Sequence, residues 1–303
     1  MLRIISLAML VLGLQACSSV RLAYNQAPLA AYWYLDSYVD FSAEQKPVVK
    51  SALNELHHWH RQTQLPAYIE TLKKMQAQLT EPLTPARACD FYREVEERLM
   101  MSLVGAVRFE QTPSASFNLQ KLAMLDRNQL AHLERKFASS NLKYREDYMK
   151  GTPRQMREKR LEQAVSRTEM IYGKLDDRQQ ALLQTRLEQS GFDPEIAYAE
   201  RLRRQQDMLQ TLSTLALPGT SGSSVMTPAA GQTAAAGLAF EAVFNRAVLS
   251  PDPGHREHAQ KLRTHNCQTL ADVHNSTTPA QRQKALATLQ GYEQDLRALL
   301  RHP

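Results

Sequence analysis

The sequence lacks the short motifs that mark the commonest catalytic sites. It contains no GxSxG segment to present a hydrolase serine, no HExxH zinc motif and no glycine-rich phosphate loop. Serine, histidine and aspartate are present, as in almost any chain, but no spacing groups them as a catalytic set. We therefore expect a protein with no catalytic residues and no cofactor.

Cysteine is scarce, at three residues in 303. None lies in a CxxC pair or at metal-ligand spacing, which argues against redox catalysis. If Cys17 is acylated, Cys89 and Cys267 remain, and an oxidising compartment would favour a disulfide between them. Such a bridge closes a long loop and would stabilise the fold by about 4–5 kcal/mol through chain entropy. Two buried thiols are the alternative, because the sequence does not give the distance between them.

Glycine, valine and isoleucine are also few, whereas leucine, alanine, glutamine, arginine and glutamate are abundant. This composition favours helix over sheet. Apolar residues recur at three- and four-residue spacing, as at Leu161, Val165 and Ile171, with charged residues between them. We predict an all-α fold, a multi-helix bundle of antiparallel amphipathic helices. After the N-terminal segment, no apolar run is long enough to span a membrane.

One short pattern marks five predicted helix starts, namely Ser, Thr or Asp followed three residues later by Gln. This spacing is typical of a capping box, in which the first side chain accepts from the N3 backbone amide and the Gln side chain accepts from the cap residue's own amide. Each box predicts the start of a helix. The five pairs are Ser42 and Gln45, Asp126 and Gln129, Thr152 and Gln155, Asp176 and Gln179, and Thr278 and Gln281.

The N-terminal segment has the features of a secretory signal, since Arg3 precedes an apolar run from Ile4 to Leu14. Leu14-Gln15-Ala16-Cys17 resembles the lipobox of bacterial lipoproteins, in which the signal is removed before the cysteine and the thiol receives a diacylglycerol. The resemblance implies that Cys17 is lipidated. Because Ser18 rather than Asp follows, it also implies the outer membrane, with the protein facing the periplasm. An ordinary cleaved signal with an incidental cysteine is the alternative.

Composition divides the chain into four parts. Residues 1–16 form the signal peptide, and residues 17–215 form a lipid-anchored helical body. Residues 216–237 are rich in Gly, Ser, Thr and Ala and carry no charge, which predicts a flexible loop. We expect residues 238–303 to form C-terminal helices that dock on the body, with the bridge from Cys89 to Cys267 between them.

The first third of the chain resembles an uncharacterised proteobacterial lipoprotein family, domain of unknown function 6279, and the resemblance extends to about Leu215. It rests on the segments Cys17–Asn25, Ala31–Asp40 and Trp59–Pro66. The family has no established activity, so the resemblance implies anchoring and helical structure but no catalysis.

Two of the capping boxes resemble a second family. Leu175–Gln179 and Thr278–Gln281 are similar to the LTxxQ motif of small periplasmic stress proteins that act as ATP-independent chaperones. Asp176 replaces the Thr of that motif in the first segment, and Thr277 replaces the Leu in the second. This resemblance implies a chaperone-like role.

Aromatic residues are concentrated soon after Cys17. Tyr and Trp suit a membrane interface, since each joins an apolar ring to a polar tip, but they also dominate core packing. We expect these residues to form the core of the first helix, because an acyl anchor needs no second apolar contact. A membrane interface is the alternative. The residues are Tyr24, Tyr32, Trp33, Tyr34 and Tyr38.

His57 and His60 would share one helical face, and histidines at this spacing can ligate zinc or copper if another helix supplies a third ligand. No third ligand can be named, so we expect hydrogen-bonded histidines and no metal. Basic clusters at residues 154–160 and 201–204 could meet anionic headgroups, peptidoglycan or an acidic client. The glutamates among them favour a role in solubility instead.

These features predict an outer-membrane-anchored periplasmic lipoprotein with a non-catalytic binding, chaperone-like or envelope-structural role. Its partners would be the membrane, through the lipid anchor, and an envelope protein or an unfolded client. Nucleic acid is not expected, because the net charge of +6 is mild for this length and no recognition motif accompanies it. A cell-envelope enzyme or a metal-binding protein with an unrecognised site is the alternative.

Overall fold

The computed structural model describes residues 18–109, 125–216 and 230–301. Within these ranges the chain forms twelve helices and no strand, which confirms the predicted all-α multi-helix fold. None of these helices has the length and apolar content that a membrane span requires. The signal segment and Cys17 lie outside the described residues.

Within each described range the helices follow one another with short connections. The first five are α2 (Ser19–Asn25), α3 (Ala27–Val39), α4 (Gln45–Thr63), α5 (Leu65–Gln78) and α6 (Pro85–Phe109). The next four are α8 (Arg127–Tyr148), α9 (Pro153–Tyr172), α10 (Asp177–Glu188) and α11 (Pro194–Leu215). The last three are α12 (Ala230–Val248), α13 (Pro253–Ser276) and α14 (Pro279–Arg301).

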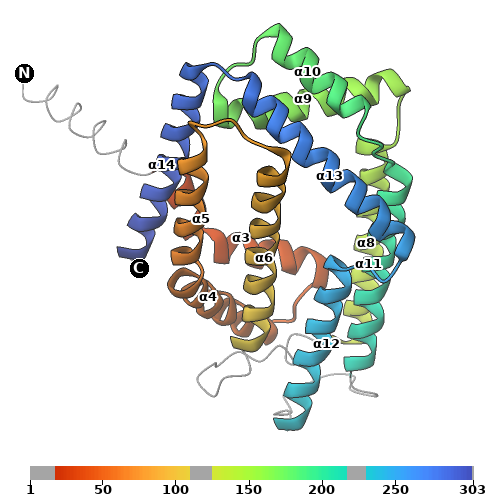
Figure 1. Ribbon diagram of the computed structural model, residues 1–303. Helices are drawn as coiled ribbons and strands as arrows, with labels where there is room; N and C mark the ends of the chain where they lie inside the picture. The colour runs from red at the N-terminus through yellow and green to blue at the C-terminus, as the bar shows by residue number, and fades with distance from the viewer. Residues whose placement is uncertain (1–17, 110–124, 217–229, 302–303) are drawn as a thin grey trace, which may run out of the picture.

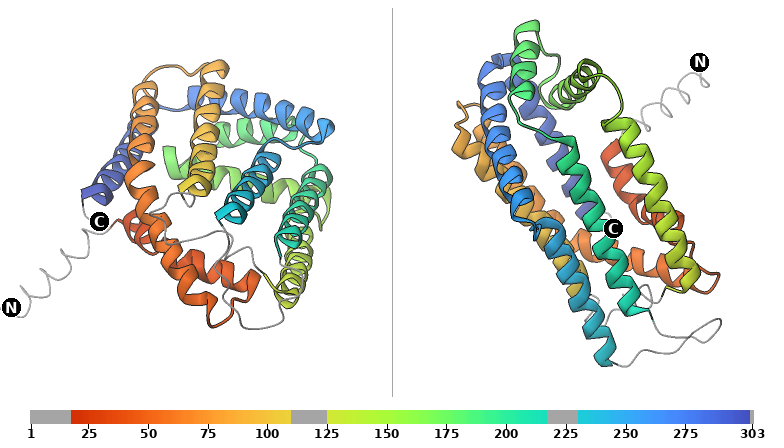
Figure 2. Two further views of the ribbon diagram at one scale, coloured as in Figure 1. Left: turned by 90° about the horizontal axis from the view of Figure 1, so that it is seen from below. Right: turned by 90° about the vertical axis from the view of Figure 1, so that its right-hand side faces the viewer.

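Helices from distant parts of the chain pack side by side. α5 and α14 form one side of the molecule and α8 and α11 the opposite side, with α6, α12 and α13 between them (Figures 1 and 2). α14 also contacts α2 and α9, so the last helix packs against the first. The C-terminal helices therefore complete a core that the N-terminal helices begin.

All five predicted capping boxes are formed. Three of them cap α8, α9 and α10, and a fourth begins α14. The box at Ser42 is displaced from its helix: both of its bonds to Gln45 are present, but α4 begins only at Gln45. This box occupies the turn before the helix.

Buried apolar side chains gather in several clusters. The largest joins α3, α8, α11 and α12 through residues such as Tyr32, Leu133 and Phe240. A second joins α5, α9 and α14, with Tyr172 and Leu289 among its members. The stripe predicted along residues 161–172 faces two of these clusters, which confirms its amphipathic character.

A disulfide joins Cys89 of α6 to Cys267 of α13, with the Cα atoms 5.1 Å apart. Ala88 and Ala271 beside it are fully buried, so the two helices approach closely there. The bridge links residues 178 apart in sequence and ties an early helix to a late one.

The loop predicted for residues 216–237 extends too far at its C-terminal end. α12 begins at Ala230, so residues 230–237 are helical. Alanine is the strongest helix former, and the run Ala234–Ala236 extends the helix towards its start. Ala236 is also fully buried, so packing adds to this preference. Residues 217–229 of the predicted loop lie outside the described part of the chain.

Candidate functional site

The aromatic segment divides between core and surface. Tyr32 is only 3% exposed, and Tyr24 and Tyr38 are half-buried against other helices. Trp33 and Tyr34 are instead 61% and 64% exposed. Core packing therefore accounts for three of the five predicted rings and leaves two on the surface.

His60 lies in a chain of hydrogen bonds. Its Nδ1 is 2.9 Å from the Tyr24 hydroxyl and its Nε2 is 3.3 Å from the Tyr68 hydroxyl. His57 stacks on the Tyr24 ring at a centroid distance of 4.5 Å. Burial lowers the pKa of both imidazoles, so both are neutral at pH 7. No group of three His, Cys, Asp or Glu side chains suited to a metal gathers anywhere in the described ranges.

A second tyrosine–histidine contact lies between α9 and α13. The Tyr172 hydroxyl is 2.9 Å from Nδ1 of His274, whose Nε2 is 2.9 Å from the backbone oxygen of Glu81. A carbonyl only accepts, so Nε2 donates and Nδ1 accepts from the tyrosine. Burial lowers the pKa of His274 and raises the pKa of Tyr172 to about 12. Both groups are neutral and fully bonded, which fits a structural role.

The basic cluster at residues 201–204 is used inside the fold. Arg203 and Arg204 donate to the carboxylate of Glu200, which is 5% exposed and also accepts from Ser250. Burial raises the pKa of Glu200, but the donated hydrogen bonds outweigh it and lower the pKa to about 2. Arg201 donates to two side chains of α8. These guanidinium groups are therefore committed to internal partners.

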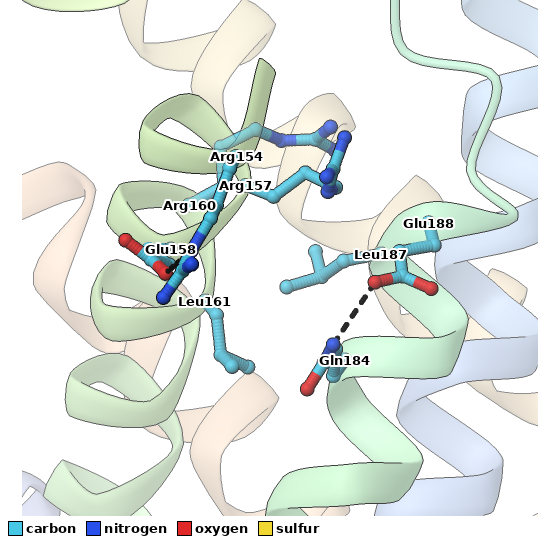
Figure 3. Close-up of a pocket in the computed structure, with 8 residues that line it drawn as sticks. All are labelled: Arg154, Arg157, Glu158, Arg160, Leu161, Gln184, Leu187 and Glu188. Atoms are coloured by element: carbon cyan, nitrogen blue, oxygen red, sulfur yellow. Dashed lines mark hydrogen bonds and ion pairs between the residues drawn. The ribbon is translucent and has the colours of Figure 1, made fainter. Parts of the chain in front are cut away.

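The other basic cluster lines a pocket of about 300 Å³ between the N-terminal half of α9 and the C-terminal half of α10 (Figure 3). Arg154 donates to Glu158 at 2.7 Å. Arg160 donates to Ser190 at 3.0 Å, and its guanidinium lies 4.7 Å from the centre of the Phe192 ring. The lining residues are Arg154, Arg157, Glu158, Arg160, Leu161, Gln184, Leu187 and Glu188.

The guanidinium of Arg157 is unpaired within the described part of the chain. Its side chain extends towards α10 (Figure 3) and meets no hydrogen-bond or ion-pair partner within the described ranges. Leu161 and Leu187 also line the pocket, so an apolar surface lies among charged groups of both signs. The lining contains no serine, threonine, cysteine or histidine, and its two carboxylates, Glu158 and Glu188, accept hydrogen bonds from Arg154 and Gln184.

Four of the capping glutamines pair across the fold, a feature that their local spacing does not predict. Gln45 and Gln129 donate to each other's side-chain oxygen at 3.4 and 2.6 Å. Gln179 and Gln281 do the same at 2.8 and 2.9 Å. The partners are 84 and 102 residues apart. We call the two pairs, with their boxes, the first and second glutamine nodes.

Each node also bonds to the backbone before a box. In every case a glutamine donates to the carbonyl oxygen two residues before the cap of the opposite box. The fourth equivalent position, residue 124, lies outside the described residues. The same geometry at both nodes indicates two copies of one arrangement. The donor and acceptor residues are Gln129 and Asp40, Gln179 and Ser276, and Gln281 and Lys174.

The helices around the nodes repeat as well. α3 precedes the first node and packs against α4 and α8, the helices that follow its two boxes. α9 precedes the second node and packs against α10 and α14, which follow the boxes there. The same three-helix arrangement therefore occurs once in the first half of the described chain, up to α8, and once in the second half, from α9.

The residue before the box differs between the four paired boxes and the unpaired one. A buried side chain precedes every paired box, whereas Gly151 precedes the unpaired box at Thr152. This difference is visible in the sequence and could have indicated which boxes meet. The four buried residues are Phe41, Leu125, Leu175 and Thr277.

α6 carries an apolar stripe on its outer surface. Tyr92, Val95 and Leu99 recur at three- and four-residue spacing and are 36%, 50% and 55% exposed. The exposed charges of Arg93 and Glu97 lie on the same helix. Aligned apolar side chains among charges are suited to contact with another polypeptide.

Comparison with known proteins adds one match. A family model described as a family of unknown function (DUF6279) matches residues 37–218, which include the first node and the first box of the second. No curated protein and no solved structure matches the chain.

Proposed function

This chain belongs to the DUF6279 family, whose function is unknown, and we propose from its own residues that it is a lipid-anchored periplasmic protein that binds unfolded polypeptides and catalyses no reaction. The mature chain would begin at Cys17, carry acyl chains there and be held at the outer membrane. The exposed apolar stripe on α6 is the observation that carries the binding role.

Two independent features support the periplasm. The sequence Leu14–Cys17 follows a signal-like segment and resembles a lipobox. The disulfide between Cys89 and Cys267 suits an oxidising compartment, because cytosolic thiols are kept reduced. The proposed anchor and the disulfide therefore point to the same side of the inner membrane.

The nodes extend the resemblance to LTxxQ chaperones from two boxes to four. Phe41–Gln45 and Leu125–Gln129 have the same elements as the second node: a buried residue, a cap and a glutamine that crosses to another box. Four motifs in two matching pairs are a more specific resemblance than single capping boxes, which arise in any helical protein. This favours the chaperone-like form of the proposal over a purely structural one.

The apolar stripe on α6 is the surface that we assign to the client. An unfolded polypeptide exposes apolar side chains, and Tyr92, Val95 and Leu99 offer aligned apolar contacts to them. Such contacts need no ATP and no covalent step.

Suppression of aggregation tests this proposal. The purified chain is mixed at equal concentration with a substrate protein that is unfolding, and light scattering is followed without ATP. We expect the wild-type chain to slow the rise in scattering. The triple variant Tyr92→Ser, Val95→Ser, Leu99→Ser should lose most of this effect.

A matched control changes three exposed apolar residues on other helices. The variant Leu142→Ser, Met170→Ser, Leu202→Ser removes side chains that are 65%, 63% and 40% exposed on α8, α9 and α11. It should suppress aggregation as well as the wild type does. If the wild-type chain does not slow scattering at comparable concentration, the chaperone-like role is wrong.

The anchor is tested separately in cells. The Cys17→Ser variant should lose lipid labelling and sedimentation with membranes. If it is processed and sediments as the wild type does, the proposed placement at the membrane is wrong.

A further inference from the structure

The first two helices expose a face without charge. Between residues 19 and 37, ten side chains are exposed, and none of them is ionisable at neutral pH. We call this surface the α2–α3 face. Its residues are Ser19, Leu22, Ala23, Asn25, Gln26, Leu29, Ala30, Trp33, Tyr34 and Ser37.

The large side chains of this face are aligned. Leu22, Leu29 and Trp33 are separated by seven and four residues and are 60%, 49% and 61% exposed. Gln26, between α2 and α3, keeps a helical backbone and continues the hydrogen-bond ladder on both sides. The two helices therefore present one continuous apolar line.

Most other helices of the described chain expose charged side chains, and the exception is α12, whose exposed Ala235, Leu238, Asn245 and Val248 carry no charge. α8, which packs against α3, is an example of a charged face. Its exposed side chains include Glu134, Arg135, Lys143 and Glu146. The α2–α3 face thus differs from most of the described surface, in a chain with 22% charged residues, and unlike the α12 face it lies next to Cys17 in sequence.

The start of this face is fixed to the body of the protein. Ser18 donates to the Asp295 carboxylate on α14, and Arg21 pairs with the same carboxylate at 3.2 Å. α2 packs along α14. Ser18, the first described residue, directly follows Cys17 and is bonded to α14, so no long tether separates residue 17 from the body.

We infer that the α2–α3 face lies against the headgroup layer of the membrane that holds Cys17, an inference that rests on the lipid anchor proposed above. Acyl chains at residue 17 bring Leu22 to the bilayer surface, since α2 begins two residues later. Trp33 and Tyr34 have the amphipathic rings that favour the interface. An uncharged face avoids the large desolvation cost that charged side chains would meet near the acyl region. The lipid thus sets the orientation of the whole protein.

Fluorescence quenching by brominated phospholipid tests the inference. The chain has two tryptophans, so Trp59→Phe leaves Trp33 as the only reporter and Trp33→Phe leaves Trp59. Both lipidated variants are reconstituted in phosphatidylethanolamine–phosphatidylglycerol vesicles that contain lipid brominated on the upper acyl chain. We expect Trp33 emission to be quenched at least about threefold more strongly than Trp59 emission, because Trp33 would lie at the interface.

Two further substitutions act as a matched pair in the Trp59→Phe background. Leu29→Asp places a charge on the α2–α3 face and should reduce Trp33 quenching. Leu142→Asp places the same charge on α8, where the leucine is 65% exposed, and should leave quenching unchanged. Circular dichroism checks that both variants remain helical.

The outcomes test the α2–α3 face and the lipid anchor independently. Equal quenching of Trp33 and Trp59 in lipidated, vesicle-bound protein overturns the inference and leaves the anchor intact. That result would mean that the face meets another protein or a second copy of the chain. If Cys17→Ser leaves the mass and membrane sedimentation of the chain unchanged, the anchor is wrong and the membrane placement of the face falls with it.

Discussion

The two glutamine nodes make the same hydrogen bonds in different surroundings. Phe41 and Leu125 place the first node beside the largest apolar cluster, whereas the second lies near the polar contact of Tyr172 with His274. The mutual amide distances are uneven at the first node, 3.4 and 2.6 Å, and nearly equal at the second, 2.8 and 2.9 Å. Because the same pattern of hydrogen bonds forms beside different neighbours, we attribute it to the residues of the boxes themselves.

Removing the disulfide should have the largest effect on how the two halves depend on each other. Replacing Cys89 and Cys267 by serine releases a constraint across 178 residues. The free energy of unfolding should fall by about 5 kcal/mol because the unfolded chain regains loop entropy. Urea unfolding followed by circular dichroism measures the change. An unaltered urea midpoint would show that packing alone holds the halves together.

Breaking either node should cost less, and by a similar amount at each. Gln129→Ala and Gln179→Ala each remove three hydrogen bonds between boxes, two that the glutamine donates and one that it accepts, which should lower the free energy of unfolding by about 2–3 kcal/mol. Gln155→Ala removes an unpaired box glutamine and should cost less than about 1 kcal/mol. Equal losses for all three variants would mean that cross-pairing contributes nothing beyond local capping.

Two helical glycines should respond in opposite directions. A Cβ at Gly105 of α6 would lie 2.8 Å from Cζ2 of Trp59, so Gly105→Ala should destabilise by roughly 1–2 kcal/mol. A Cβ at Gly291 of α14 meets nothing within 4 Å, so Gly291→Ala should stabilise by about 0.5–1 kcal/mol. Thermal unfolding of the two variants gives both signs, and stabilisation by Gly105→Ala would contradict the close packing of α4 on α6.

The smallest expected effect is a pH dependence of the free energy of unfolding, to which His60 and His274 both contribute. Burial holds the pKa of His274 below its ordinary 6.5, and His60 is shifted in the same direction. Below about pH 6.5 the unfolded chain takes up protons that the folded chain resists, so stability falls as the pH decreases. His274→Gln should weaken this dependence between about pH 7.5 and 5, and its slope should then reflect His60 and His57. An unchanged slope would show that His274 does not contribute.

The positions of helices could be predicted well from local chemistry. Capping residues such as Asp126 and Asp176 act on amides within their own turn, so the sequence contains all the information that they need. The start of α12 was predicted eight residues late, because uncharged Gly, Ser, Thr and Ala were taken as one loop while the alanines at 234–236 belong to the helix. Composition alone does not show where a run of alanine becomes buried.

The candidate sites depend on contacts that local patterns do not encode. Gln45 gives no sign of a partner 84 residues away, and Arg203 looks like a surface charge until Glu200 is found buried beside it. Trp33 and Tyr32 are adjacent in sequence, yet one is exposed and the other buried. Which ring faces water depends on α4 and α8, not on the ring itself.

The contacts of α14 also limit when the protein can finish folding. This helix ends the described chain and packs against α2, α5 and α9, and Asp295 meets Ser18 across 277 residues. Until the final helix emerges during synthesis, Leu79 and Tyr172 have no Ala285 or Leu289 to cover them. A nascent chain would therefore expose these apolar side chains until its last residues are made, and only then could α2 pack against α14.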